Sequence, residues 1–147
     1  MTSWIDDDLA MAPMPAEGQI ADFAQTFKAV VALIEDWQFG YDPELWHTFG
    51  TEMLHLPIPD FGTPRLEELR EAVDWINREI AAGKKVLVHC LVGRGRSGTV
   101  AAAYLISKGF DADDAIQHVR RHVHGAIETR EQEELLRRFD QERKTKR

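Results

Sequence analysis

Among the first fifty residues, one segment has apolar side chains at helical spacing, and the segments on either side of it are irregular. Residues 1–19 mix prolines, a glycine and acidic side chains, which is typical of irregular structure. Over residues 20–35 the apolar side chains recur every three or four positions, and this spacing predicts a first amphipathic helix. They are Phe23, Phe27, Val30, Val31 and Ile34. Residues 38–50 carry two glycines and an Asp-Pro step, and we expect a loop there.

Two short apolar runs follow, and each leads through a loop into a longer periodic segment. Residues 53–58 indicate a strand that ends in the proline-rich loop 59–63. Residues 66–80 place apolar side chains three and four apart, as a helix does. Residues 86–88 are too short and too apolar for anything but a buried strand, and the glycine-rich loop 90–96 comes directly after them.

Capping residues indicate where the later helices begin. Thr63 and Pro64 provide an N-cap and a first-position proline for the helix over 66–80. Residues 99–107 are apolar nearly all round, which predicts a buried helix. Asp111 is expected to cap the next amphipathic helix, and a last helix is expected from about residue 129 to 142.

This order of strand, loop, helix, strand, loop and helix predicts parallel strands joined by right-handed crossovers. We therefore expect one α/β domain over residues 1–147, with a central parallel or mixed sheet and helices on both faces. The loops 59–63 and 90–96 would leave the carboxyl ends of neighbouring parallel strands, which is the edge where open α/β sheets bind ligands. Asp60 and Cys90 are therefore expected to face each other.

Length and composition narrow the class of protein. The chain has 147 residues, 44% of them hydrophobic, and one cysteine, which excludes intrinsic disorder, collagen and a disulfide scaffold. No apolar run approaches the roughly 18 residues of a membrane span, so no membrane partner is expected. The start of the chain is acidic and lacks the basic and apolar regions of a secretory signal. We expect a cytoplasmic location, where a lone cysteine stays a thiol.

The net charge of −7 is unevenly distributed. Residues 1–60 carry 11 acidic and one basic side chain, whereas residues 61–147 carry 14 acidic and 17 basic ones. A globally acidic chain binds nucleic acid poorly, so no nucleic-acid partner is expected. The basic C-terminus is interpreted as a solvated helix end that the helix dipole favours, rather than a docking tail. Its cations are Arg137, Arg138, Arg143, Lys144, Lys146 and Arg147.

Candidate chemistry is concentrated in the segment His-Cys-Leu-Val-Gly-Arg-Gly-Arg-Ser at residues 89–97. A strand ends there and a buried helix follows the loop. Successive backbone N–H groups of such a loop can surround an anion, and the start of the helix adds positive charge. Arg96 can hold two oxygens of the same anion through its planar fork. These features favour the thiolate of Cys90, which would be a nucleophile placed against phosphorus.

The spacing His-Cys-x5-Arg-Ser resembles the signature of the cysteine-dependent protein tyrosine phosphatases. Ile58-Pro59-Asp60 resembles the general-acid loop of the small, atypical dual-specificity phosphatases. Residues 127–132 resemble the segment that follows the penultimate helix in those proteins. The likeness covers most of residues 50–142. Many larger tyrosine phosphatases have a tryptophan where Ile58 stands, which suits the small type.

The resemblance implies a role for each residue of the motif. Cys90 would be the nucleophile that forms a phosphocysteine intermediate, and Arg96 would bind the phosphoryl oxygens. Asp60 would protonate the leaving oxygen and later activate the water that hydrolyses the intermediate. Ser97 would hydrogen-bond the thiolate and ease its departure in the second step.

Further residues would support this site. His89 would orient the loop from behind, and Glu128 and Gln132 would shape the site or position water. The backbone N–H groups expected to cradle the phosphate belong to Leu91, Val92, Gly93, Arg94, Gly95 and Arg96.

The resemblance therefore implies a phosphatase domain that hydrolyses phosphotyrosine, with phosphoserine and phosphothreonine left open. The expected partners are a phosphorylated protein or peptide and inhibitory oxyanions such as phosphate or vanadate. No metal or organic cofactor is expected, because the thiolate, Arg96 and Asp60 supply the nucleophile, the charge stabilisation and the proton. The alternatives are a non-catalytic module that binds phospho-ligands, or a phosphatase for RNA 5′ ends or phosphoinositides. The acidic net charge and the lack of lysine in residues 91–95 disfavour the latter.

Simpler interpretations apply to other residues. Asp60 could be only a turn residue after two prolines. The histidines at 118, 122 and 124 include an i, i+4 pair that could ligate zinc, but no cysteine or carboxylate has ligand spacing to them, so a solvated helix face is favoured. The tryptophans are expected to pack in the core or at its edge. They are Trp4, Trp37, Trp46 and Trp75.

Overall fold

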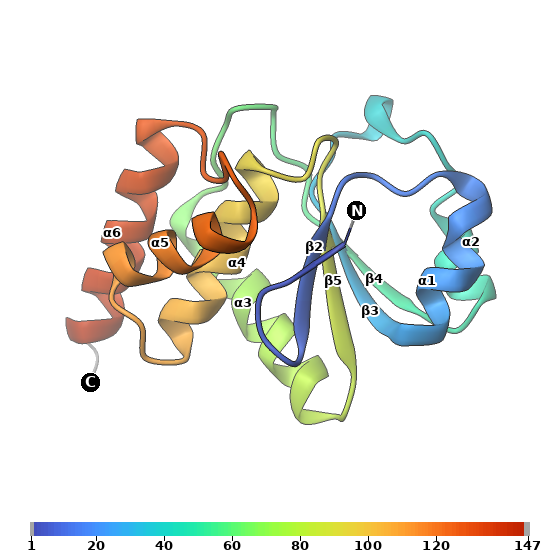
Figure 1. Cartoon of the computed structure of the whole chain (residues 1–147), viewed down its shortest axis with the longest axis horizontal. Helices are drawn as coiled ribbons and strands as arrows, with labels where there is room; N and C mark the ends of the chain where they lie inside the picture. Colours follow the sequence, from blue (N-terminus) through green and yellow to red (C-terminus); the bar gives the residue numbers. More distant parts are fainter. Residues whose placement is uncertain (1, 146–147) are drawn as a thin grey trace.

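The sheet is the centre of the fold in the computed structural model, which describes residues 2–145. Five strands of this part of the chain pair in the order β1-β2-β5-β3-β4 (Figure 1). They are β1 (Ser3–Trp4), β2 (Leu9–Ala12), β3 (Phe27–Ala32), β4 (Glu52–His55) and β5 (Lys85–His89). β1 pairs antiparallel with β2, and the other pairs are parallel. The sheet is therefore mixed.

Helices cover both faces of this sheet (Figure 1). They are η1 (Glu17–Gln19), α1 (Ile20–Thr26), η2 (Asp36–Gln38), α2 (Glu44–Thr48), α3 (Leu66–Ala81), α4 (Gly95–Ser107), α5 (Ala112–His122) and α6 (Arg130–Thr145). The short helices α1 and α2 lie on one side, and α3 to α6 lie on the other. The predicted α/β class, with a mixed sheet between two helical layers, is confirmed.

The core has two parts because successive side chains of a strand point to opposite faces. On β5, Val86 and Val88 join the larger core against α3 to α6, whereas Leu87 joins the smaller core against α1 and α2. β2 divides in the same way. A parallel strand buried on both faces has no polar side, so it reads as a continuous apolar run.

This double burial explains why the predicted helix over residues 20–35 is wrong in its second half. α1 ends at Thr26, and Phe27–Ala32 form β3, which lies between β5 and β4. The apolar residues of this stretch also match helical spacing, because almost every position is apolar. Periodicity alone does not separate a buried strand from a buried helix.

Two segments expected to be irregular also contain elements. Residues 1–19 include β1 and β2, and β2 pairs in register with β5, Leu9 opposite Val86. Residues 38–50 include the five-residue helix α2. These elements are too short for a repeat to be visible in the sequence, and their pairing partners lie far along the chain.

The loops 59–63 and 90–96 do not follow neighbouring strands, as we had expected, because β3 lies between β4 and β5. All three strands are parallel, so the loops still leave the same edge of the sheet. Leu33, the residue after β3, makes hydrogen bonds to the residues that precede both loops. The N–H of Leu33 donates to the carbonyl of His89 at 3.0 Å, and the N–H of Ile58 donates to the carbonyl of Leu33 at 3.0 Å.

Helix boundaries differ from the expected ones at two places. The N-cap of α3 is Arg65, not Thr63. α4 begins at Gly95 rather than at residue 99, so Arg96 and Ser97 lie in its first turn. Asp111 occupies the N-cap position of α5, as predicted, but its side chain makes no capping hydrogen bond.

The basic C-terminus is partly paired rather than simply solvated. Lys144 lies 3.3 Å from Asp111 and 3.2 Å from Asp140, and Arg137 pairs with Asp113. Lys146 and Arg147, which share this prediction, lie outside the described residues. No helix within residues 2–145 combines the length and the apolar character needed to cross a membrane.

Candidate active site

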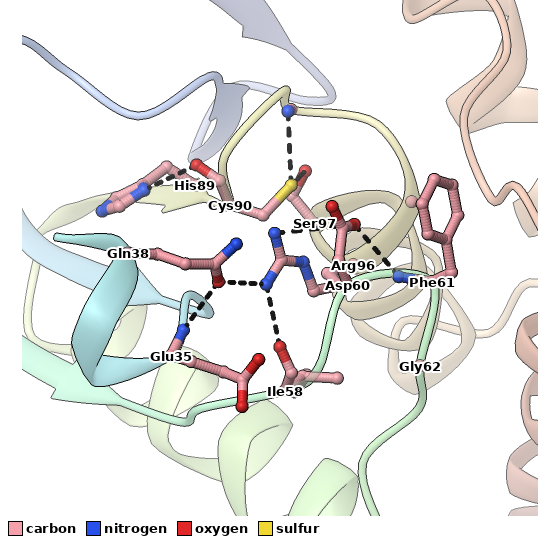
Figure 2. A network of polar contacts seen from close by, with 12 residues as sticks. Glu35, Gln38, Ile58, Asp60, Phe61, Gly62, His89, Cys90, Arg96 and Ser97 are labelled. Carbon is pink, nitrogen blue, oxygen red and sulfur yellow. Dashed lines mark hydrogen bonds and ion pairs between the residues drawn. The ribbon is translucent and has the colours of Figure 1, made fainter. Parts of the chain in front are cut away.

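The loop that follows β5 surrounds the sulfur of Cys90 (Figure 2). This side chain is 2% exposed and points into the loop. The N–H of Gly93 donates to Sγ at 3.2 Å, and the hydroxyl oxygen of Ser97 lies 3.3 Å from Sγ. These two contacts hold the sulfur in one position within the loop.

Gly93 lets the loop pack against the end of β2. Its φ angle is +88°, and a Cβ there would lie 2.7 Å from the nitrogen of Pro13 and 2.9 Å from the carbonyl carbon of Ala12. The carbonyl of Leu91 also accepts the N–H of Met14 at 3.1 Å. Only glycine fits both the φ angle and the space, and the curvature of the loop depends on it.

Arg96 is almost fully buried, and one nitrogen of its guanidinium makes both of its hydrogen bonds to the protein. Nη1 donates to Oε1 of Gln38 at 2.9 Å and to the carbonyl of Ile58 at 2.8 Å. Nη2 lies 3.6 Å from Oδ1 of Asp60, and Nε has no hydrogen-bond partner among the described residues. An unpartnered buried N–H is costly, so the free Nε–Nη2 edge is suited to two oxygens of an anion.

Asp60 is brought to Arg96 by a tight turn after β4. The N–H of Gly62 donates to the carbonyl of Pro59 at 2.8 Å, and Phe61 adopts a positive φ of 62°. Oδ1 of Asp60 accepts the N–H of Phe61 at 3.0 Å. The carboxylate stays partly exposed beside the guanidinium, so it can reach both solvent and a group bound at Arg96.

Gln132 connects this turn to the start of α6. Its side chain is fully buried, and Nε2 donates to the carbonyl of Gly62 at 3.1 Å. Oε1 accepts the N–H groups of Glu128 at 2.8 Å and Thr129 at 3.2 Å. The Glu128 carboxylate is exposed and lies where a Cβ on Gly95 would be. Gln132 therefore holds the turn that carries Asp60.

His89 lies behind the loop in a chain of buried hydrogen bonds. Nδ1 donates to the carbonyl of Cys90 at 3.0 Å, so Nε2 is the acceptor for the hydroxyl of Tyr41 at 2.8 Å. Nε1 of Trp46 donates to the same hydroxyl oxygen at 3.0 Å. Burial lowers the pKa of His89 to about 4, and burial raises the pKa of Tyr41 to about 12. Both groups are therefore neutral at neutral pH.

The structure brings together the predicted residues Cys90, Arg96, Ser97 and Asp60. Sequence reasoning missed Gln38, Tyr41 and Trp46, which all precede the motif by forty residues or more. Their segment has no periodicity and reads as a loop. The signal that could have found them is the pair of aromatic side chains with polar tips, which need a buried partner when they pack in a core.

The histidines of α5 make hydrogen bonds with the backbone. Nε2 of His118 donates to the carbonyl of Ile5 at 2.9 Å, and Nδ1 of His122 donates to the carbonyl of His118 at 2.9 Å. Among residues 2–145, no three histidine, cysteine or acidic side chains cluster as they would around a metal ion.

A buried sulfur, a half-free guanidinium and a partly exposed carboxylate thus surround one position at the start of α4. Residues 12–110 match the family described as "Polymorphic toxin system, DSP-PTPase phosphatase". The crystal structure of Tk-PTP in the active form superposes with a TM-score of 0.93 and is 44% identical, covering 95% of this chain and 96% of that one.

Two curated relatives are similar over most of this chain. An uncharacterized protein of Methanocaldococcus jannaschii is 36% identical over 107 residues, which are 72% of this chain and 71% of its own. The human phosphatidylglycerophosphatase and protein-tyrosine phosphatase 1 is 28% identical over 130 residues, which are 82% of this chain and 65% of its own. The chain spans about two thirds of that human relative. With its phosphatase fold and two thirds of its residues matched, the chain belongs to the DSP-PTPase family of cysteine-dependent phosphatases, which hydrolyse phosphomonoesters.

Proposed function

We propose that this protein hydrolyses phosphotyrosine in phosphorylated proteins or peptides, through a phosphocysteine intermediate on Cys90. The observation that carries the proposal is the guanidinium of Arg96. Its Nε–Nη2 edge lies between the loop that surrounds Sγ and the carboxylate of Asp60, and Nε has no hydrogen-bond partner within residues 2–145. A phosphoryl group held there by two oxygens would have its phosphorus beside the sulfur.

In the first step, the thiolate of Cys90 attacks phosphorus and the bond to the tyrosine oxygen breaks. Asp60 gives its proton to that oxygen, so the leaving group departs as a neutral phenol. The charge on the phosphoryl oxygens is carried by Arg96 and by the N–H groups of the loop, which are fixed before the reaction begins.

In the second step, water attacks the phosphorus of the phosphocysteine and the P–S bond breaks. The carboxylate of Asp60 takes the proton from the water, which restores the acid for the next turnover. The hydroxyl of Ser97 lies within reach of Sγ and would stabilise the departing thiolate. Inorganic phosphate is the product.

Exposed apolar side chains near the site favour an aromatic substrate. Phe61, next to Asp60, is 59% exposed, and Val92, in the phosphate loop, is 55% exposed. Apolar side chains in such positions gain free energy when they cover a ring, so we propose that they contact the ring of a bound phosphotyrosine. A phosphoserine or phosphothreonine side chain offers less apolar surface, so we propose that it is the poorer substrate.

The name of the human relative covers two kinds of substrate, a phospholipid and a phosphoprotein. For this chain the loop composition favours the phosphoprotein, since Arg94 is the one cation among residues 91–95. An anionic lipid surface is also disfavoured by the net charge of −7. We also propose a cytoplasmic location, where Cys90 would stay a reduced thiol.

The experiment is phosphate release in the presence of a chelator, from a phosphotyrosine peptide, a phosphothreonine peptide and phosphatidylglycerophosphate vesicles. Wild type is compared with Cys90→Ser, whose turnover should fall roughly a thousandfold or more while it keeps phosphate binding. Faster release from the phosphotyrosine peptide supports the proposal. Faster release from vesicles would make the lipid the substrate, and vanadate binding without release from any substrate would indicate a binding module.

A further inference from the structure

Trp37 is the most exposed large apolar side chain of the described residues, at 78%. The expectation that the tryptophans pack in the core or at its edge is therefore wrong for this one. Within residues 2–145 its ring makes no hydrogen bond, ring contact or cation–π contact. A solvated indole leaves a large apolar face uncovered, which is a cost unless something binds it.

The position of Trp37 relative to the catalytic arginine is determined by its neighbour Gln38. Oε1 of Gln38 accepts Nη1 of Arg96 at 2.9 Å and also the N–H of Glu35 at 3.0 Å. The η2 turn is thus attached to the guanidinium that would hold the phosphate (Figure 2). The η2 turn, which carries Trp37, therefore lies at the rim of the active site on the Gln38 side of Arg96.

The rim around Trp37 is acidic. Glu35 and Asp36 directly precede it, and the Asp36 side chain is 92% exposed, with a 3.6 Å contact to Nδ1 of His55. No lysine or arginine of the described part pairs with either carboxylate. Residues 13–51, which lie between β2 and β4 in the sequence, carry six carboxylates and only one lysine or arginine, Lys28.

We propose that Trp37, Asp36 and Glu35 form a subsite for a cationic side chain of the substrate, close in sequence to the phosphorylated residue. This inference rests on the proposed function and names the class of phosphopeptide that it prefers. An arginine or lysine over the indole face gains a cation–π contact, which is strongest with tryptophan. The two carboxylates also attract the cationic side chain, and they would repel an acidic side chain at the same position of the peptide.

The charge of the rim favours a cation over an apolar side chain as the occupant. An apolar occupant would leave Asp36 and Glu35 without a partner, and it would displace water from them on binding. Gln38 binds Nη1 of Arg96, the same guanidinium whose Nε–Nη2 edge would hold the phosphoryl group, so the η2 turn is one side chain away from the phosphate site. A bound peptide would therefore present its flanking side chain to the indole.

The test compares three phosphotyrosine peptides that differ at one flanking position, with arginine, alanine or glutamate there, each flanking position being taken in turn. We expect kcat/KM to be about three- to tenfold higher for arginine than for alanine at one of these positions, and lower again for glutamate. The preference should shrink in high salt, because salt screens exposed charges.

Variants locate the preference. Trp37→Ala and the double variant Glu35→Gln, Asp36→Asn should each reduce the ratio of arginine to glutamate kcat/KM, while an unflanked aryl phosphate is hydrolysed at the wild-type rate. Asp22→Asn, which removes an exposed charge from α1, should leave the ratio unchanged. Equal rates for the three peptides, or a preference that survives in both variants, would overturn the subsite. Lack of turnover with every peptide would contradict the proposed function instead.

Discussion

The hydroxyl of Tyr41 donates a hydrogen bond of 2.8 Å to Nε2 of His89, and the two residues are 48 positions apart. Nδ1 of the same ring donates to the carbonyl of Cys90, and Nε1 of Trp46 donates to the tyrosine oxygen. Each donor in this series of hydrogen bonds has one acceptor, so the tautomer of His89 and the direction of every hydrogen bond are determined. The carbonyl next to the nucleophile is thereby fixed from behind.

Tyr41→Phe should lower both stability and activity. The substitution leaves Nε2 of His89 and the N–H of Trp46 buried without a partner, which costs about 1–3 kcal/mol of unfolding free energy. We expect kcat to fall several-fold as the carbonyl of Cys90 becomes less well fixed. Urea unfolding and phosphate release measure the two effects.

Tyr104→Phe is the matched control for this variant. The Tyr104 hydroxyl donates to Oδ2 of Asp6 at 2.6 Å, away from the loop that holds Cys90. Tyr104→Phe should lower the free energy of unfolding and leave kcat at the wild-type value. If both variants lose kcat in proportion to stability, the Tyr41 bond has no positioning role.

The pH dependence of stability should show the buried His89. Its pKa is about 4 in the folded protein, below the ordinary value of 6.5, because burial disfavours the charged form. The unfolded chain therefore binds a proton at a higher pH than the folded chain does. The contribution of His89 to stability is complete above pH 6.5 and is lost as the pH falls toward about 4.

Urea midpoints measured between neutral pH and pH 4.5 check this expectation. The variant His89→Asn should be less stable at neutral pH but should lose less stability than wild type over this window. The control His47→Asn removes an exposed histidine and should follow the wild-type curve. An identical slope for His89→Asn and wild type would mean that His89 is not the group responsible.

Asp60→Asn should affect substrates according to their leaving groups. A poor leaving group needs a proton as the P–O bond breaks, whereas a good one departs without it. We expect a loss of roughly a hundredfold on phosphotyrosine peptide and a much smaller loss on an activated aryl phosphate. Equal losses on both substrates would contradict the role of Asp60 as general acid.

The same pairing predicts how the rate depends on pH. Turnover needs the thiolate of Cys90 and the protonated carboxyl of Asp60 together, so kcat/KM should fall on both sides of one optimum. In Asp60→Asn the fall on the alkaline side should disappear, because that limb reports loss of the proton from the acid. A profile that is flat in wild type from about pH 5 to 8 would contradict the pairing.

Gly93→Ala should be far more damaging than Gly83→Ala, although both glycines have a φ of +88°. An alanine at either position pays the cost of left-handed backbone, about 1 kcal/mol. At Gly93 the new Cβ would also meet the backbone of Pro13 and Ala12, whereas at Gly83 nothing lies within 4 Å. Urea unfolding and phosphate release should show a stable, active Gly83→Ala and an inactive Gly93→Ala. Equal effects would mean that the contact with β2 does not shape the loop.

Local sequence was enough for the elements whose signals are local. The strand β5, the helices α3, α4 and α5, and the motif from His89 to Ser97 were all predicted, because capping residues, glycines and helical periodicity lie within each segment. Asp60 was placed at the correct edge of the sheet because parallel strands end together. The expected neighbouring strands were wrong, since nothing local reveals that β3 inserts between β4 and β5.

Chain order and side-chain chemistry thus determined the α/β class, the nucleophile and its arginine, because these depend on residues within a few positions of one another. Only the tertiary structure decided that residues 27–32 form a central strand, since burial on both faces removes the alternation that distinguishes strands. It also decided which groups hold His89 and Arg96, namely Tyr41 and Gln38, and that Trp37 is exposed beside them. Hydrogen bonds and exposure depend on which segments meet in space, and those meetings are set by the packing of the whole sheet.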